Sequence, residues 1–385
     1  MKKWITLALI ALLPLAQAAS ADEGIFGEPL CFRGISAVFE FDGTVLPNGN
    51  FLLFGSTMSG NGLFGPQSAK ETGFALCADA AGDVIWSYTC DEAESNYVLG
   101  AVPKGDGGAW LLYREYIEGK GLTHRLIDAQ PDGAHVVHEL GKDVTGMYPA
   151  GDGGMFVDAT TWDNLPDGLL WSPQLSRLDA DGNELWTRAF EAYPYHGMFS
   201  HFTPHGDGYR AIGVEESQGP IRRAFIAEFD AHGNLLDVYK TDGDTRTYFS
   251  DIAWLPDGGL VAAGYEMIGS EMQGRMWRFG ADGSIVFKKE YYPSAQQTNF
   301  FAVASVGDAV FAINGFDNLR TFCVDRIEPD GSISVSYPYT GNLYPAGEFE
   351  FVRILEKDGR LYIALCAAEA KAQGAESLYI IPLDL

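Results

Sequence analysis

A tight turn recurs along this chain about every fifty residues, and it constrains the fold more than any other feature. Glycine adjoins an acidic or amide residue in seven copies, at Asn48, Asp106, Asp152, Asp207, Asp257, Asp308 and Asp358. Glycine supplies the positive φ that a tight hairpin needs, and Asp or Asn tolerates the neighbouring position. Short β-rich runs flank the turns, such as DIAW and LVAAG around Asp257. Each copy therefore predicts a β-hairpin.

A second turn follows the first in six of the seven units, at Gly82, Gly133, Gly182, Gly233, Gly283 and Gly331. These glycines are spaced by 51, 49, 51, 50 and 48 residues, and a large apolar residue often stands four positions later, as at Trp86, Trp186 and Phe287. Two hairpins per unit mean four strands per unit. Such units, repeated without helical segments, predict an all-β fold, a seven-bladed β-propeller.

The last unit has no second turn and so lacks its outer strand. The segment EPLCFRGI, residues 28–35, precedes the first complete unit. We expect it to supply the missing strand, with residues near 29–34 pairing with those near 378–383, because an unpaired edge strand is a liability. Cys31 and Cys366 would then share a blade, either as a disulfide or as two unlinked thiols. Residues 28–385 are expected to form a single propeller domain.

The first residues are typical of a secretory signal peptide over residues 1–18. Two lysines precede a short apolar run, and small residues stand at Ala16 and Ala18, which predicts cleavage after Ala18 or after Ala21. No Cys follows at a lipoprotein-type position, and no later stretch reaches the ~20 apolar residues that a spanning helix needs. The expected product is a secreted or periplasmic monomer.

Charge and cysteine content exclude several classes of partner. The formal charge of −26 becomes −28 when Lys2 and Lys3 leave with the signal peptide, and this repels nucleic acid and anionic lipid. Five cysteines without a CxxC pair exclude a disulfide-rich scaffold and a Cys-rich zinc module. The sequence has no GxSxG, HExxH or Walker motif, so it predicts neither a metal nor a cofactor.

Units that read LPDGG and then RLDADGNELW or a close variant resemble the repeats of exported bacterial propellers in the PQQ-like and delta-60-like group. The resemblance covers nearly the whole chain after the signal peptide and implies the propeller fold. The group includes quinone enzymes and assembly scaffolds. The DADGN turn lacks the Thr-Gly of the quinone repeat, so the resemblance does not imply quinone binding.

Loops of variable length belong to the rim opposite the first turns, and binding residues tend to lie on such loops. Aligned inner strands put His201, Asp251 and Arg353 at one level, where Gly100, Gly146 and Ala302 occupy the same register. Just above, at the ends of second strands, the alignment places Glu115, Glu215 and Glu266. These groups suit acid–base chemistry or a charged ligand, or they satisfy one another around a water-filled channel.

Aromatic residues suggest a second contact region on the same rim. Trp162 and Trp171 bracket a predicted loop that carries Asp163 and Asn164, and Tyr195 follows on the next connection. Exposed tryptophans would stack on a sugar or grip a peptide; alternatively they anchor their own loop.

Three functions fit this pattern. The favoured one is a binding or scaffold module that recognises a protein, peptide or glycan. The second is an enzyme with its site at the channel mouth, of lyase, hydrolase or sulfotransferase type; His201 and Arg353 are similar to the His and Arg of the arylsulfotransferase family, whose other motifs are absent. The third is a structural component of the envelope. No catalytic motif selects the enzyme, and the fold alone does not choose.

Overall fold

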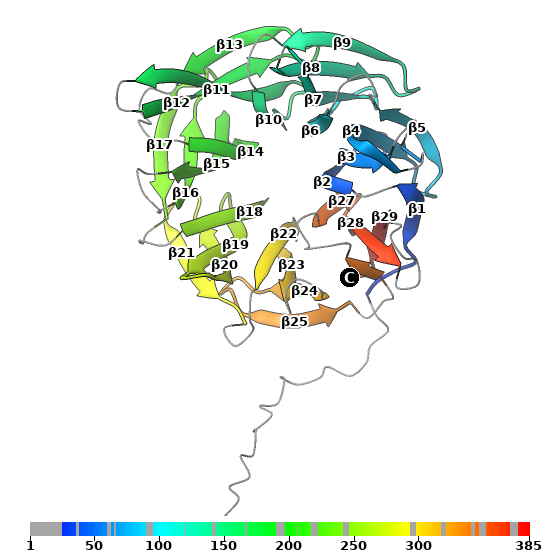
Figure 1. The fold of residues 1–385 in the computed structure, drawn as a ribbon. Helices are drawn as coiled ribbons and strands as arrows, with labels where there is room; N and C mark the ends of the chain where they lie inside the picture. The colour runs from blue at the N-terminus through cyan, green and yellow to red at the C-terminus, as the bar shows by residue number, and fades with distance from the viewer. Residues whose placement is uncertain are drawn as a thin grey trace, which may run out of the picture.

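The computed structural model describes residues 25–35, 38–59, 63–64, 67–89, 95–119, 121–140, 144–165, 168–189, 197–205, 207–216, 222–241, 246–292, 298–316, 321–339, 343–345, 352–369 and 376–385. The predicted signal peptide and Tyr195 lie outside these residues. The regular elements within them are all β-strands, and their sheets are arranged radially around a common centre (Figure 1). The prediction of an all-β propeller is confirmed.

Four sheets contain four antiparallel strands each, in sequence order from the centre outward. They are β10 (Val144–Pro149), β11 (Met155–Leu165), β12 (Gly168–Leu178) and β13 (Glu184–Ala189); β14 (Gly197–His205), β15 (Gly208–Glu216), β16 (Arg222–Phe229) and β17 (Leu235–Lys240); β18 (Arg246–Trp254), β19 (Leu260–Ile268), β20 (Glu271–Phe279) and β21 (Ile285–Glu290); and β22 (Asn299–Val306), β23 (Ala309–Phe316), β24 (Thr321–Ile327) and β25 (Ile333–Pro338).

The fifth sheet joins the two ends of the described chain. It contains β1 (Leu30–Ile35), β26 (Leu343–Pro345), β27 (Val352–Lys357), β28 (Arg360–Glu369) and β29 (Glu376–Leu383). We call it the closing blade.

The remaining strands form one eight-stranded sheet. They are β2 (Val38–Val45), β3 (Phe51–Ser59), β4 (Gln67–Ala78), β5 (Val84–Thr89), β6 (Ser95–Pro103), β7 (Ala109–Ile117), β8 (Gly121–Ala129) and β9 (His135–Leu140). A single parallel residue pair, Glu71 with Ser95, links the β2–β5 half to the β6–β9 half. The described chain therefore has five separate blades and one double-sized sheet, which corrects the prediction of seven separate four-stranded blades.

An N-terminal strand closes the ring, as the missing outer strand predicted. β1 pairs antiparallel with β29, from Leu30 opposite Ile380 to Ile35 opposite Glu376. Cys31 lies opposite Tyr379 and Cys366 opposite Leu378, and no disulfide joins these two described cysteines. Of the two alternatives for this pair, the structure has the unlinked thiols.

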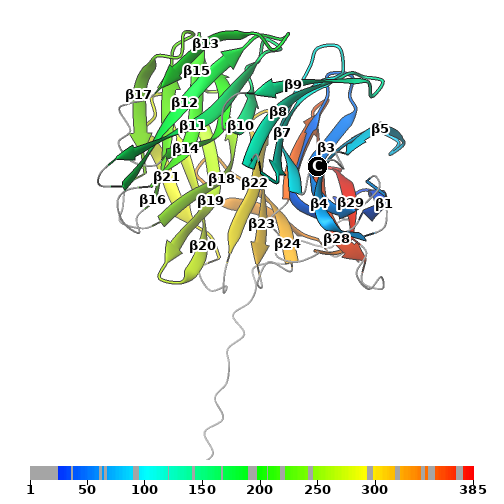
Figure 2. The ribbon, with the colours of Figure 1, turned by 45° about the horizontal axis from the view of Figure 1, so that its top comes forward.

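The core lies between neighbouring blades. One cluster joins Phe156 of β11 to Phe202 of β14, with their rings stacked at a centroid distance of 5.2 Å. A second joins Trp110 of β7 to Met155 of β11, both essentially inaccessible to solvent. β18 and β22 are neighbours in both views (Figure 1, Figure 2). Each blade therefore depends on the next for burial of its apolar faces.

The glycines of the second turns have two functions. Gly331 has a φ of 78°, and a Cβ built on it would lie 2.8 Å from Cζ of Phe287 in the preceding blade. A Cβ at Gly133 would lie 2.8 Å from Cβ and 3.3 Å from the ring atom Cγ of Trp86. Glycine therefore supplies the positive φ of the turn and also makes room for an aromatic ring from the neighbouring blade. This contact explains why an apolar residue recurs four positions after the turn.

We predict that Phe32→Ala lowers the free energy of unfolding by about 3 to 5 kcal/mol. Phe32 is buried in the hydrophobic cluster that joins the closing blade to β3. Thermal or denaturant unfolding measures the loss. Glu28→Ala is the control, since Glu28 is exposed in the same segment. Equal stability of the two variants would show that β1 does not hold the ring together.

We also predict that Gly331→Ala is more destabilising than Gly119→Ala. Both glycines have positive φ, 78° and 80°, so the backbone strain is about equal, but a Cβ at Gly119 meets nothing within 4 Å. The ring of Phe287 should add about 1 to 3 kcal/mol of overpacking to the first variant. Denaturant unfolding of both variants measures the difference, and equal losses would contradict the packing function of Gly331.

Candidate channel site

The innermost strands share one irregularity that fixes where the candidate site lies. The pairing shifts between Phe39 and Asp42, Val98 and Gly100, Val144 and Gly146, Phe199 and His201, Phe249 and Asp251, and Phe300 and Ala302. A β-bulge of this kind re-aims the side chain that follows it. Arg353 holds the equivalent place in β27, since it stands four residues before the hairpin end at Lys357, as Ala302 does before Val306.

We call these seven positions the inner ring: Asp42, Gly100, Gly146, His201, Asp251, Ala302 and Arg353. All except Ala302 line a central cavity of about 540 Å³. The structure therefore brings His201, Asp251 and Arg353 to one level, as the strand alignment predicts, and adds Asp42 to them.

The described part of the cavity extends to the rim of the first turns. Its described walls run from the inner ring toward Val45, Pro103, Pro149 and Glu356, at or near the strand ends that lead into the tight first turns. The sequence predicts a site near the opposite, variable rim. Several loops of that rim lie outside the described residues, so this stays a prediction.

Arg353 interacts with two carboxylates, those of Asp42 and Asp251. Its Nε donates to Oδ1 of Asp42 at 3.0 Å, and the Asp42 carboxylate raises the pKa of Arg353. The two side chains are 31% and 40% exposed, so they are in contact with the solvent of the channel. The guanidinium is therefore charged and reachable by a ligand.

Asp251 is held in place by the backbone. Its Oδ1 accepts from the amide of Ile252 at 2.8 Å, and its Oδ2 accepts from the amide of Val303 in the next blade at 3.0 Å. Burial raises the pKa of Asp251, while the positive charges of His201 and Arg353 act in the opposite direction. A half-buried carboxyl group with these neighbours is a candidate proton donor or acceptor.

His201 and Tyr148 form the aromatic part of the cavity wall. Their ring centroids are 6.3 Å apart, and both residues line the cavity. The phenol lies over Gly146, where a Cβ would meet it at 2.7 Å from Cζ, and its hydroxyl donates to the carbonyl of Phe199 at 2.9 Å. Gly146 at this ring position therefore makes room for Tyr148.

Asp158 is a buried acid behind this wall. It lies opposite Gly146 in the β10–β11 pairing and is 1% exposed. Its Oδ2 accepts from the hydroxyl of Thr145 at 2.9 Å, and Oδ1 makes no hydrogen bond within the described residues. Burial raises the pKa of Asp158 to about 7, against the opposing hydrogen bonds from Thr145 and the Phe199 amide.

Two of the three predicted glutamates, Glu115 and Glu266, do not line the cavity. Glu115 is 1% exposed and pairs with Arg125, with Nη2 and Oε1 at 3.0 Å. Glu266 is 3% exposed and pairs with Arg275 at 2.9 Å and with Lys288 at 2.5 Å. These ion pairs engage both carboxylates within their own blades. The backbone of Glu215 pairs with Gly197 and Arg223, and its side chain is outside the description.

The segment around the two tryptophans is a hairpin rather than a loop. β11 and β12 extend to the pair of Leu165 with Gly168, and Trp162 lies directly opposite Trp171. Asp163 and Asn164 lie opposite Leu170 and Leu169 in the same register. This corrects the predicted loop, because the strands of this blade run 11 residues each. Continued pairing of the two strands explains the length of this segment, which the sequence predicted to be an inserted loop.

The described residues show neither a metal cluster nor a membrane helix. No group of three or more His, Cys, Asp or Glu side chains within them is placed to hold a metal ion. They also include no helix with the length and hydropathy that crossing a membrane requires.

Three residues of the site were not predicted from the sequence: Asp42, Tyr148 and Asp158. A signal for Asp42 was present, because it stands six residues before Asn48, as Asp251 stands six before Asp257. The bulge in β2 runs over three positions, from Phe39 to Asp42, whereas the other bulges of the inner strands run over two. This longer bulge interrupts the alternation of apolar and polar residues that the strand alignment used. Tyr148 and Asp158 have no such signal, since their place depends on contacts between neighbouring blades.

We predict that the protein loses stability as pH rises from about 4 to about 7, because Asp158 has a pKa near 7 when folded and 3.8 as its ordinary value. The folded state then binds the proton more tightly, so its extra stability is present in acid and is lost as the pH passes the folded pKa. Asp158→Asn should remove this component and be the more stable protein at pH 8. Denaturant unfolding at a series of pH values measures it, and parallel curves for the two proteins would contradict the assignment.

No protein-family profile matches the chain, and no curated protein matches it. Solved structures do resemble it. One is an ulvan lyase, a polysaccharide lyase, with 11% identity over 92% of this chain and 96% of the other, and a TM-score of 0.58. Another is the polysaccharide lyase Uly1, with 12% identity over 87% and 88% and a TM-score of 0.54. The β-propeller domain of the Trilobed protease from Pyrococcus furiosus has 9% identity over 91% and 95%, with a TM-score of 0.52. At these identities the likeness shows the β-propeller fold alone.

Proposed function

We propose that this protein is an exported β-propeller that binds a polar small molecule or a glycan in its central cavity, at the inner ring. One observation carries the proposal. Gly100, Gly146 and Ala302 occupy three of the ring positions, so the fold does not require a charged side chain there. Asp42, His201, Asp251 and Arg353 nevertheless occupy the other four. Arg353 donates to Asp42, Asp251 accepts from the Val303 amide, and His201 lies beside the ring of Tyr148.

The chemistry of the cavity suits a ligand rich in hydroxyl groups. Two carboxylates accept hydrogen bonds, the guanidinium of Arg353 donates them, and Tyr148 and His201 offer ring surfaces. A volume of about 540 Å³ is within the range of small-molecule sites. Polysaccharide lyases and an endosialidase are among the propellers of similar fold, which puts saccharides first among the probes.

The remaining sequence-based expectations belong to the same proposal. We take the two halves of the eight-stranded sheet as two blades joined by one residue pair, which gives seven blades in all. The signal peptide, export and the monomeric state stay proposals, as does the likeness to the PQQ-like and delta-60-like group. Trp162, Asp163, Asn164, Trp171 and Tyr195 stay candidates for a second contact with a peptide, protein or glycan, and Glu215 stays a candidate catalytic residue.

A second candidate function is an enzyme of lyase or hydrolase type. It is favoured by the neighbourhood of Asp251, whose raised pKa and proximity to His201 suit proton transfer. Tyr148 and Arg353 would then position the substrate and balance developing charge. Turnover of a bound saccharide would distinguish this function from binding alone.

We predict that Arg353→Gln weakens binding of any saccharide selected from a glycan array by about tenfold to a hundredfold, because it removes a charge-assisted donor. Calorimetry with the selected saccharide measures the affinity. Arg188→Gln is the matched control, since Arg188 lies on the outermost strand β13 and its Nη1 donates to the Thr187 carbonyl at 3.1 Å.

Two results would overturn the proposal. One is an array on which no saccharide binds and a parallel screen of polar small molecules that also finds no ligand. The other is a ligand whose affinity is unchanged by Arg353→Gln and by Asp251→Asn.

A further inference from the structure

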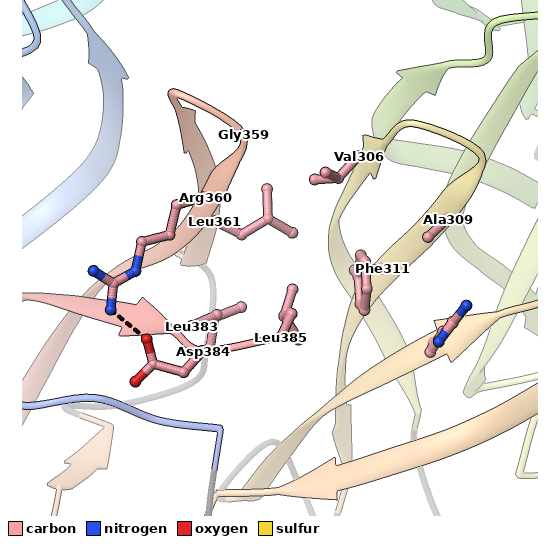
Figure 3. A pocket seen from close by; sticks show the side chains of 10 residues that line it. Val306, Ala309, Phe311, Gly359, Arg360, Leu361, Leu383, Asp384 and Leu385 are labelled. Atoms are coloured by element: carbon pink, nitrogen blue, oxygen red, sulfur yellow. Dashed lines mark hydrogen bonds and ion pairs between the residues drawn. The ribbon is translucent and has the colours of Figure 1, made fainter.

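A second cavity lies at the seam between the β22–β25 blade and the closing blade, away from the inner ring (Figure 3). Its volume is about 420 Å³. Phe311 forms one apolar wall, and Leu361 and Leu383 form the other. Two guanidinium groups, those of Arg326 and Arg360, also line it. None of the functions discussed above uses this cavity.

An equivalent junction elsewhere in the ring shows what normally fills such a space. The cavity between the β18–β21 and β22–β25 blades is only about 220 Å³. The strands that line the two cavities have the same register. Val261 pairs with Arg278 in β19 and β20, as Phe311 pairs with Arg326 in β23 and β24. The two junctions can therefore be compared residue by residue.

Two features fill the smaller cavity. The first is the second turn of the next blade, whose Pro329 carbonyl accepts from Nη1 of Arg278 at 2.7 Å. The second is Phe287, which lies opposite Arg278 in the β20–β21 pairing and lines the cavity. Other junctions repeat the first feature. Nη2 of Arg210 donates to the Ala281 carbonyl at 2.5 Å, and Nε1 of Trp110 donates to the Ala180 carbonyl at 3.1 Å.

Both features are missing at the closing seam. β29 and β1 are adjacent in space but far apart in the sequence, so no tight turn joins them. Val335 stands opposite Arg326, where the other junction has phenylalanine. Within the described residues the guanidinium of Arg326 has one partner, Glu328 at 3.8 Å, and its side chain is 48% exposed, against 19% for Arg278. The seam therefore holds a pocket with both apolar and charged walls, and a cation that lacks the carbonyl acceptor of its counterpart.

We propose that this seam cavity binds a small apolar carboxylate. The carboxylate takes the place of the turn carbonyl and accepts hydrogen bonds from Arg326. The apolar part of the ligand packs against Phe311, Leu361 and Leu383, in the space that Phe287 fills at the other junction. The nearby carboxylate of Asp384 is compensated by its ion pair with Arg360.

The test uses 3-phenylpropanoate as probe and 3-phenylpropanamide as its neutral counterpart, with the full mature chain. We expect saturation-transfer NMR and calorimetry to show binding of the acid, and at least about tenfold weaker binding of the amide. Arg326→Gln should weaken binding of 3-phenylpropanoate by a similar factor. Val335→Phe should abolish binding while the melting temperature is kept or raised, because phenylalanine fills the cavity as Phe287 does at the other junction.

The source of the carboxylate is distinguished by a second pair of probes. A tripeptide that ends in a free phenylalanine carboxylate is compared with the same peptide amidated. Tighter binding of the free peptide than of 3-phenylpropanoate would identify a protein C-terminus as the ligand; equal or weaker binding would identify a small molecule.

Two results would overturn the proposal. The first is no binding of either acid. The second is binding that neither Arg326→Gln nor Val335→Phe changes in correctly folded protein. His201→Ala should leave binding of these probes unchanged, so failure here is separate from failure of the channel proposal.

Discussion

Antiparallel pairing of β1 with β29 is the constraint on which the rest of this structure depends. Each blade buries its apolar faces only against its neighbours, so a ring that failed to close would expose two of them. Closure also builds the channel. It brings Arg353 within 3.0 Å of Asp42, although 311 residues separate them in the chain. The candidate site is therefore assembled by the same event that completes the fold.

Closure from two distant segments also has a local consequence. At the junction between the β18–β21 and β22–β25 blades, a tight turn presents Gly331 to the ring of Phe287 and the carbonyl of Pro329 to Arg278. The seam between β29 and the rest of the ring has no such turn. An unfilled cavity and a weakly paired Arg326 are what remain. Within the described residues, the absence of this turn thus leaves room for a ligand at the seam.

The periodic turns made the all-β propeller fold and the closing strand predictable from sequence, because glycine geometry and hydrophobic alternation are local properties. The merging of two units into one eight-stranded sheet was not predicted. The turns also made the level of His201, Asp251 and Arg353 predictable. The pairing of Glu115 with Arg125, and of Glu266 with Lys288, could not be predicted, since it depends on which strands face one another. The buried Asp158 and the phenol over Gly146 depend likewise on packing between blades. The extended hairpin at Trp162 was missed because Pro166 and Asp167 resemble a loop in sequence.

The central claim is that the charges of the inner ring serve a ligand rather than the fold. Half-exposed ion pairs such as that of Arg353 with Asp42 contribute about 0 to 1 kcal/mol to stability, and alanine already stands at the ring position of β22. The most direct measurement is the free energy of unfolding of a double variant, Asp42→Ala with Arg353→Ala. We predict a loss of no more than about 1 kcal/mol. A loss of more than about 3 kcal/mol, the size expected when a buried pair is broken, would show instead that the pair is part of the closure of the ring.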